Sequence, residues 1–199
     1  MRKLAAAIAI VGSLLACDVK PAPQADVATW RAEKDQFMRS TESPVPAEQR
    51  ANFPPLTYFP IDPDYQVPAA LNVTPGSEVL HLPTSTGLRR EMRRIGTLRF
   101  TLQSQELTLT AFVDAAGNDM RRLFVPFGDL TNGNDTYPGG RYLDLDRTAS
   151  GFYDLDFNRA YNPFCVFNEK YDCPLPPREN RLTVPIRAGE RLSSRPKAS

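Results

Sequence analysis

The sequence is poor in the side chains that most often carry catalytic or metal chemistry. It contains one histidine, His81, and no G-x-S-x-G segment, so a histidine-based catalytic triad and a nucleophile elbow both lack support. A mononuclear zinc site built from several histidines is excluded, because zinc sites draw several ligands from histidine and cysteine. His81 stands between Leu80 and Leu82, a position typical of an ordinary strand side chain rather than a catalytic base.

The chain also lacks a strong charge of one sign and a long apolar run. Its formal net charge is +1, so electrostatics does not favour nucleic acid as a partner, and none is expected. The uncharged apolar run near the start covers residues 4–15. That run is shorter than the roughly 20 residues that a membrane-spanning helix needs.

The apolar run has instead the layout of an export signal. Arg2 and Lys3 precede it, and residues 14–16 (LLA) stand directly before Cys17 and resemble the lipobox of bacterial lipoprotein signals. We expect cleavage before Cys17 and lipidation of its thiol, with a plain secretory signal as the alternative. Residues 1–16 are then a signal peptide and residues 17–25 an acylated, extended tether that holds the chain in the cell envelope, on the periplasmic side. Asp18 favours the inner membrane.

Proline and short apolar segments predict a mainly β fold. The 19 prolines favour turns and edge segments over long helices. Residues 106–113 alternate apolar and polar side chains, as in a half-buried strand. Turn residues separate similar short runs, which predicts a single antiparallel β-sandwich or small β-barrel-like domain over residues 26–192, followed by a frayed tail at 193–199. The expected strands are residues 80–82, 97–102, 106–113, 123–127, 142–145, 152–157 and 182–186.

One N-terminal helix is expected to pack on this domain. Asp26 can cap a helix over residues 27–39, whose apolar side chains, Trp30 among them, fall near one face. Pro46 can begin a brief second helix. Residues 53–68 alternate prolines with aromatic side chains, so we expect an extended segment that wraps the core and is not a central strand.

Cys165 and Cys173 are the cysteines that remain if Cys17 is lipidated. In an exported chain they lie in a compartment that permits oxidation. We expect a disulfide between them, which would close a short loop and stabilise the fold by about 2–3 kcal/mol. A redox-active or metal-binding pair is the alternative, but the spacing is not the C-x-x-C that lowers a thiol pKa.

Two further stretches could hold a ligand. Asp154, Asp156 and Asn158 occupy alternate positions, like the first ligands of a calcium loop. Arg159 replaces the turn glycine of that motif and its closing glutamate is absent, so no metal is assigned. Residues 89–99 carry five arginines, whose guanidinium groups can bind phosphate or carboxylate, although a solvated strand edge is favoured.

Several segments resemble one known family. Residues 155–165 (LDFNRAYNPFC) and 173–180 (CPLPPREN) closely resemble the bacterial family called domain of unknown function 1684. Similar segments are residues 94–100 (RIGTLRF), 123–131 (LFVPFGDLT), 140–144 (GRYLD) and 186–190 (IRAGE). With Trp30 and Phe37 these segments cover nearly all of the chain after the tether. The family carries no established reaction, so the resemblance implies a domain extent and candidate positions without a mechanism.

The candidate binding residues are polar positions in those matching segments. They are Asp129, Thr131, Arg141, Tyr142, Asp156, Asn158 and Asn162. The same segments also hold Asp144, Tyr161, Glu179 and Asn180. Such residues can equally form buried hydrogen-bond networks, which is at least as strong an interpretation. No catalytic residue and no cofactor is assigned.

These observations leave competing functions. We favour a non-enzymatic module of the cell envelope that binds a small or polymeric ligand in a polar cleft between residues 129–142 and 156–162. The alternative is a carboxylate-dependent hydrolase acting on envelope glycans, with Asp129 and Asp156 as the acid and base pair. A scaffold protein is a third hypothesis, which predicts an exposed apolar patch instead of a cleft.

Overall fold

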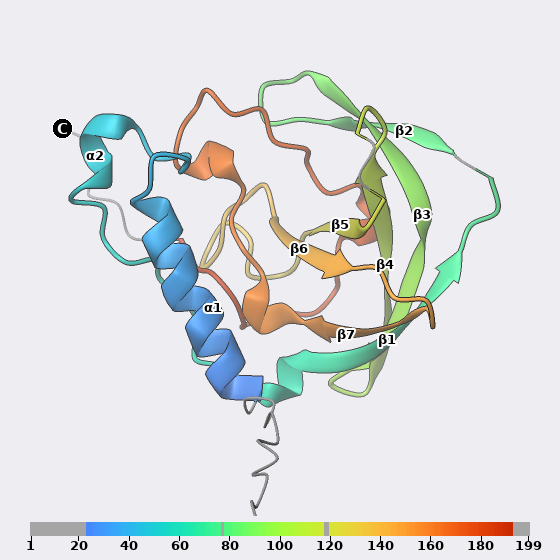
Figure 1. Cartoon of the computed structure of the whole chain (residues 1–199). Helices are drawn as coiled ribbons and strands as arrows, with labels where there is room; N and C mark the ends of the chain where they lie inside the picture. Colours follow the sequence, from blue (N-terminus) through green and yellow to red (C-terminus); the bar gives the residue numbers. More distant parts are fainter. Residues whose placement is uncertain (1–22, 77, 118–119, 193–199) are drawn as a thin grey trace, which may run out of the picture.

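The structure is a computed structural model that describes residues 23–76, 78–117 and 120–192. Within these residues the chain forms a seven-stranded antiparallel sheet that curls into a nearly closed, barrel-like shape, with a long helix along one side (Figure 1). The predicted mainly β fold with an N-terminal helix is therefore confirmed. The expected signal peptide, lipidation site Cys17 and frayed tail lie outside the described residues.

Strands β3 to β6 are neighbours in chain order, whereas β1 lies beside β3 and β7 beside β1, out of chain order. Neighbouring strands run in the order β6-β5-β4-β3-β1-β7, and β2 pairs with β3 outside this path. The strands are β1 (Gln66–Val73), β2 (Val79–Pro83), β3 (Arg89–Leu102), β4 (Gln105–Asp114), β5 (Arg122–Phe127), β6 (Arg141–Asp146) and β7 (Phe152–Asp156). The helices of the described residues are α1 (Pro23–Met38), α2 (Ala47–Arg50) and the short 3-10 turns η1 (Pro63–Tyr65), η2 (Phe157–Arg159), η3 (Phe164–Val166) and η4 (Arg178–Asn180).

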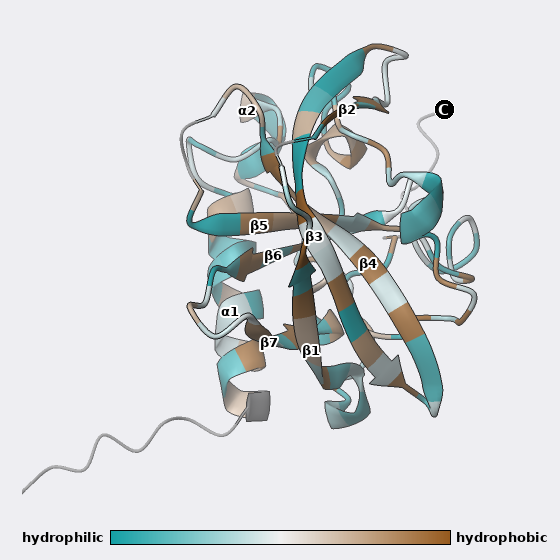
Figure 2. Cartoon of the chain, turned by 90° about the vertical axis from the view of Figure 1, so that its right-hand side faces the viewer, coloured by the Kyte–Doolittle hydropathy of each residue, from teal (hydrophilic) through white to brown (hydrophobic). Residues whose placement is uncertain are grey.

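The long strands β3 and β4 show why this sequence forms a sheet. Hydrophobic and hydrophilic residues alternate along both strands (Figure 2), which buries one face of β3 over residues 97–102, whereas residues 109–113 of β4 are buried on both faces. The β3 register shifts between Arg94 and Gly96, where β1 comes very close. A Cβ atom at Gly96 would lie 2.3 Å from the Asn72 carbonyl oxygen, so only glycine permits this approach.

Two predicted segments differ from the structure. Part of the expected wrapping segment, from Gln66 onward, belongs to β1, which lies between β3 and β7. Pro68 is tolerated there because β1 pairs with β3 only from Ala69, so Pro68 faces β7 alone. Residues 182–186, expected as a strand, have their alternating apolar side chains buried but form no strand, because Pro185 and side-chain hydrogen bonds replace a regular ladder.

Helix α1 begins at Pro23, earlier than expected and inside the segment predicted as tether. Proline fits the first turn of a helix, where its missing N–H costs no hydrogen bond, so Asp26 lies in the first turn instead of capping the helix. The expected buried face is present, since Val27 and Met38 are 2% and 0% exposed. Within the described residues, no helix is both long and apolar enough to span a membrane.

Buried apolar side chains form three clusters, and their positions determine where hollows can exist. The main core lies on one face of the sheet and includes Leu182 and Ile186 from the irregular C-terminal segment. A second cluster on the opposite face centres on Met92 and Phe112, with Phe124 packed against it. A third cluster joins α1 to the segment that follows it, through buried Met38, Val45 and Leu56 with Phe53 and Phe167 packed against them.

Candidate functional site

The structure divides the predicted binding residues among four places, two buried networks and two hollows. Asp129, Thr131 and Arg141 form one fully enclosed network. Both oxygens of Asp129 are engaged: Oδ1 accepts from the Thr131 amide at 2.8 Å, the Thr131 hydroxyl at 2.6 Å and the Ile186 amide at 3.1 Å. Oδ2 pairs with Arg141 Nη2 at 3.0 Å, and both side chains are 0% exposed. The buried carboxylate of Asp129 therefore has both a cationic partner and hydrogen-bond donors.

Arg141 also organises the C-terminal segment. Its Nη2 donates to the Ile186 carbonyl at 2.8 Å, and its Nη1 donates to the carbonyls of Ala188 and Glu190. Burial lowers the pKa of Arg141, and the Asp129 carboxylate opposes this shift. The guanidinium group therefore supplies donors that a neighbouring strand would supply in a regular ladder, which gives Arg141 a structural role.

Asp156 and Asn158 form a second network at the end of β7. Asp156 Oδ1 accepts from the Asn158 amide and side-chain nitrogen, both at 2.9 Å. Asn158 binds both backbone groups of Asp62, as acceptor at 2.9 Å and donor at 2.8 Å. Arg31 of α1 donates to the Asn158 carbonyl at 3.1 Å and to the Phe59 carbonyl at 2.9 Å. These bonds attach α1 to the end of the sheet.

This geometry does not favour the hydrolase or the calcium loop. A glycosidase needs two carboxyl groups facing one substrate, but Asp129 and Asp156 are bound in separate networks with side chains 0% and 8% exposed. Asp154 is exposed and accepts from Gln66 Nε2, away from the contacts of Asp156. Among the described residues, no group of three His, Cys, Asp or Glu side chains is placed to hold a metal ion.

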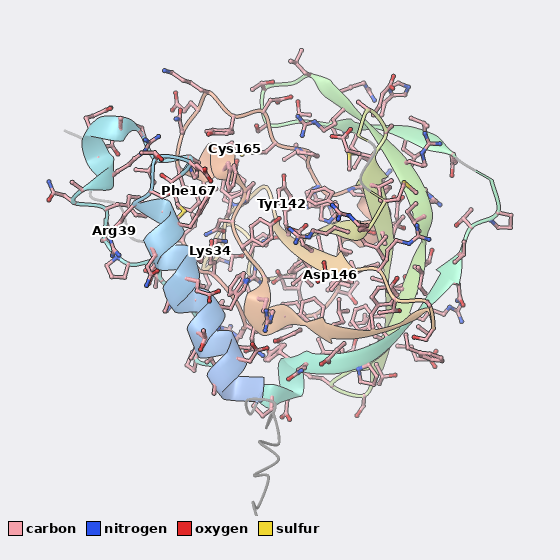
Figure 3. All side chains as sticks on the ribbon, in the orientation of Figure 1. Lys34, Arg39, Tyr142, Asp146, Cys165 and Phe167 are labelled. Carbon is pink, nitrogen blue, oxygen red and sulfur yellow. The ribbon has the colours of Figure 1, made fainter. Side chains whose placement is uncertain are left out.

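Tyr142 and Asn162 each line a different hollow, and the segment at residues 161–174 lies between the two hollows. The Tyr142 hollow has a volume of about 450 Å³ and lies over the second apolar cluster, on the sheet face opposite the main core. The aromatic side chains that line it are Phe124, Tyr142, Tyr161, Phe164 and Tyr171. In Figure 3, Tyr142 lies within the molecule, between α1 and the long strands.

The rings of the Tyr142 hollow are held in fixed orientations. The Tyr142 ring meets Phe124 edge-to-face with centroids 4.6 Å apart, and Tyr161 at 5.7 Å. Phe164 meets Tyr171 edge-to-face at 5.4 Å. The Tyr142 hydroxyl donates to the Pro174 carbonyl, and burial raises its pKa, so it stays protonated. These contacts define the orientation of the Tyr142 ring, while Tyr171 is 36% exposed at the edge of the hollow.

Charged groups of both signs line the same hollow. Arg90 and Lys170 supply cations, and Asp114 and Asp172 supply carboxylates. Asp172 Oδ1 accepts from the Thr86 hydroxyl at 2.6 Å, and such hydrogen bonds lower its pKa, so it is ionised at neutral pH. Of the predicted basic stretch, Arg90 is the residue at this hollow; Arg94 instead pairs with Glu179 at 3.0 Å.

The Asn162 hollow is larger, about 880 Å³, and lies on the other side of the same segment. Its walls come from the region around α2, from Tyr137 and from residues 162–169 and 191–192. Asn162 is 2% exposed; its Nδ2 donates to the Arg191 carbonyl at 3.1 Å. Its Oδ1 has no hydrogen-bond partner among the described residues, which is an unusual state for a buried amide oxygen.

A buried ion pair connects α1 to residues that line the two hollows. Lys34 Nζ lies 2.5 Å from Glu190 Oε1, with the side chains 12% and 0% exposed. Glu190 Oε2 accepts from the backbone N–H of Asn162 at 2.8 Å. The Lys34 ammonium lies 4.2 Å from the centroid of the Tyr161 ring. Burial lowers the pKa of Lys34, and Glu190 opposes the shift. The pair connects α1 to both Asn162 and Tyr161.

Cys165 and Cys173 lie between the hollows as free thiols. Cys165 lines the Asn162 hollow and Cys173 lines the Tyr142 hollow. The Cys165 amide donates to Cys173 Sγ at 3.1 Å, so the residues are adjacent. The expected disulfide is not formed in this structure and stays a prediction.

Sequence reasoning missed most of the residues that line the hollows. Tyr171 and Tyr137 were not singled out, because separate segments supply them, and Arg90 was noted only as part of the basic stretch at residues 89–99. A usable signal was the density of rings between Tyr161 and Tyr171, where four aromatic residues occur within eleven positions. A short segment cannot bury that many rings within itself. Their density therefore indicates an apolar surface that packs on other parts of the chain or on a ligand.

Comparison with known proteins gives a family and a fold but no activity. The family model described as "Protein of unknown function (DUF1684)" matches residues 51–191. A solution NMR structure of an uncharacterised protein of Haloarcula marismortui is similar, with a TM-score of 0.67 and 40% sequence identity over 85% of this chain and 94% of that chain. No curated protein matches the sequence.

Proposed function

Because this chain belongs to the family described as "Protein of unknown function (DUF1684)", whose description assigns no activity, we propose a function from the chain's own geometry. We propose that the protein is a non-enzymatic binding module that holds a sugar ring of an envelope glycan in the Tyr142 hollow. The observation that carries the proposal is the convergence of Phe124, Tyr142 and Tyr171, with Tyr161 and Phe164, on one hollow of about 450 Å³. Ligand pockets of this size are typically aromatic, with a few polar groups that orient the ligand.

The side chains that line the Tyr142 hollow explain the choice of a sugar. The C–H face of a sugar ring is apolar and can pack on aromatic rings such as Tyr171. Its hydroxyl groups both donate and accept, so they can donate to Asp114 and Asp172 and accept from Arg90 and Lys170. The two carboxylates would repel a purely anionic ligand, and a purely apolar ligand would leave the charged side chains of the hollow without hydrogen bonds.

Binding can be tested with soluble oligosaccharides released from purified peptidoglycan. We expect Tyr171→Ala and Arg90→Ala each to weaken binding at least tenfold, equivalent to about 1.4 kcal/mol, measured by isothermal calorimetry. Phe152→Ala and Arg89→Ala are matched controls, because Phe152 is 68% exposed on another surface and Arg89 precedes Arg90 on β3 and points the opposite way. Equal binding by Tyr171→Ala and wild type would refute the proposed site.

The location in the envelope rests on the N-terminal residues and has its own test. In the native bacterium we expect mass spectrometry of the envelope fraction to find a chain that begins at Cys17 and carries acyl chains on that residue, because residues 14–16 resemble a lipobox. Cys17→Ser should remove the acyl mass and leave residues 1–16 attached. A cytosolic chain with intact Met1 and no fatty acid would contradict the anchor.

A further inference from the structure

The contact between Cys165 and Cys173 is held in place by independent elements. Cys165 lies in η3, and Cys173 is held against the turn between β2 and β3. There, the Ser85 amide donates to the Cys173 carbonyl at 2.8 Å, and the Cys173 amide donates to Ser85 Oγ at 3.0 Å. Neighbouring Pro174 forms a bridge with Thr84. The sulfur atoms can therefore react with each other without rearrangement of the sheet.

The two thiols have unequal access and unequal chemistry. Cys165 is partly exposed and faces the Asn162 hollow, whereas Cys173 is 5% exposed. Hydrogen bonds from the Cys173 thiol, the Ser85 hydroxyl and the Tyr137 hydroxyl lower the pKa of Cys165 to about 7. The same contact with Cys165, together with burial, raises the pKa of Cys173. An accessible thiolate can attack a disulfide, and a thiol held beside it can resolve the mixed disulfide that forms.

We propose that Cys165 and Cys173 form a redox-active dithiol that reduces disulfide substrates entering the Asn162 hollow. The Cys165 thiolate attacks one sulfur of the substrate disulfide, whose S–S bond breaks and releases one thiolate, which takes up a proton. Cys173 then loses its proton and attacks Cys165 Sγ, which forms the Cys165–Cys173 disulfide and releases the second thiol. The substrate gains two electrons from the pair and two protons, one that Cys173 loses and one from water. A thiol reductant, such as reduced glutathione, restores the pair.

The Asn162 hollow indicates a disulfide carried by a peptide. Its volume of about 880 Å³ can admit a small peptide, and apolar side chains such as Phe53, Leu56 and Phe167 line it. The buried Asn162 Oδ1, which has no hydrogen-bond partner among the described residues, can accept a backbone N–H of such a substrate. The disulfide can belong to oxidised glutathione or to a loop of another protein, and the test below separates these sources.

The test uses the full chain with Cys17→Ser, so that Cys165 and Cys173 are its only cysteines. We expect the reduced chain to become a disulfide on mixing with oxidised glutathione or with a disulfide-cyclised peptide, and to return to the dithiol in excess reduced glutathione. The substrate that reacts at least tenfold faster identifies the source. Adding Cys173→Ser should trap a mixed disulfide on Cys165, whereas Cys165→Ser should react at least tenfold more slowly.

A second measurement keeps both cysteines and does not depend on those variants folding. The rate of Cys165 alkylation, mapped by mass spectrometry, should rise with pH around a midpoint near 7. Tyr137→Phe removes a hydroxyl donor and should move the midpoint upward, whereas Tyr171→Phe should leave it unchanged. A midpoint that Tyr137→Phe does not move would overturn the proposed thiolate.

Other results would also refute the dithiol. A Cys165–Cys173 disulfide that persists in millimolar reduced glutathione is a structural crosslink, as the sequence first suggested. A pair that never oxidises with either disulfide has no exchange activity. Neither result affects oligosaccharide binding at the Tyr142 hollow, which is measured with Tyr171→Ala and Arg90→Ala and does not involve the thiols.

Discussion

Replacing Arg141 with methionine is expected to lower the free energy of unfolding by about 3–5 kcal/mol, the cost of removing one partner of a buried ion pair. The side chains of Arg141 and Asp129 are both 0% exposed and lie 3.0 Å apart. Without the guanidinium group, Asp129 would stay buried beside no cation, and the carbonyls of Ile186, Ala188 and Glu190 would lose their donors. Urea denaturation followed by fluorescence measures the change.

A matched exposed pair is the control for this experiment. Arg122 and Asp146 lie 3.6 Å apart, but their side chains are 62% and 89% exposed, so Arg122→Met should cost less than about 1 kcal/mol. The double variant Asp129→Leu/Arg141→Met should lose less stability than the sum of the single variants, because no unpaired charge stays buried. A loss below about 1 kcal/mol for Arg141→Met would show that Asp129 finds another partner.

Asn180→Ala is expected to destabilise the protein by about 3–5 kcal/mol, since it leaves several buried backbone groups without partners. Asn180 is 0% exposed. Its Oδ1 accepts from the Thr110 amide at 2.7 Å, and its Nδ2 donates to the carbonyls of Thr110 at 2.9 Å and Pro126 at 2.7 Å. Thermal and urea denaturation of the purified variant should both show the loss.

The position of Asn180 in the sheet explains why so large an effect is expected. Within the described residues, the register between β4 and β5 consists of one pair, Phe112 and Phe124. Asn180 bridges the strands beside that pair, so its side chain takes the place of ladder hydrogen bonds. The exposed Asn134 is the control, and Asn134→Ala should change stability by less than about 0.5 kcal/mol. Equal stability of both variants would argue against this role.

Local sequence patterns predicted the part of the fold that local physics determines. The alternation at residues 106–113 predicted a strand with one buried face; β4 (Gln105–Asp114) confirms the strand, but its residues 109–113 are buried on both faces. The strand that contains Pro68 was missed because proline was taken to exclude a central strand. At Pro68, however, β1 pairs only with β7, so this position has a neighbouring strand on one side alone. Residues 182–186 were wrong as a strand because alternation reports burial, not backbone pairing.

The site was harder to predict than the fold, for a related reason. Polar residue types do not reveal whether a side chain meets solvent or a buried partner. Asp129 and Arg141 look as suited to a ligand as Tyr142 or Asn162, yet the first two bind each other and only the latter two line hollows. Sequence spacing also hid the adjacency of Tyr137 to Cys165, because their contact depends on how β6 and the loops around it pack.

The dependence of the sheet on Asn180 and on the carbonyls of residues 186–190 has a consequence for biogenesis. A chain that emerges from the ribosome or a translocon with its N-terminus first exposes β1 to β7 before these closing residues arrive. Until residue 180 has emerged, the seam between β4 and β5 is unsealed, and until residues 186–190 have emerged, Arg141 lacks the carbonyls that accept its hydrogen bonds. The half-made barrel is then the state most open to proteases and self-association, and the synthesis of residues 180–190 ends that vulnerable interval.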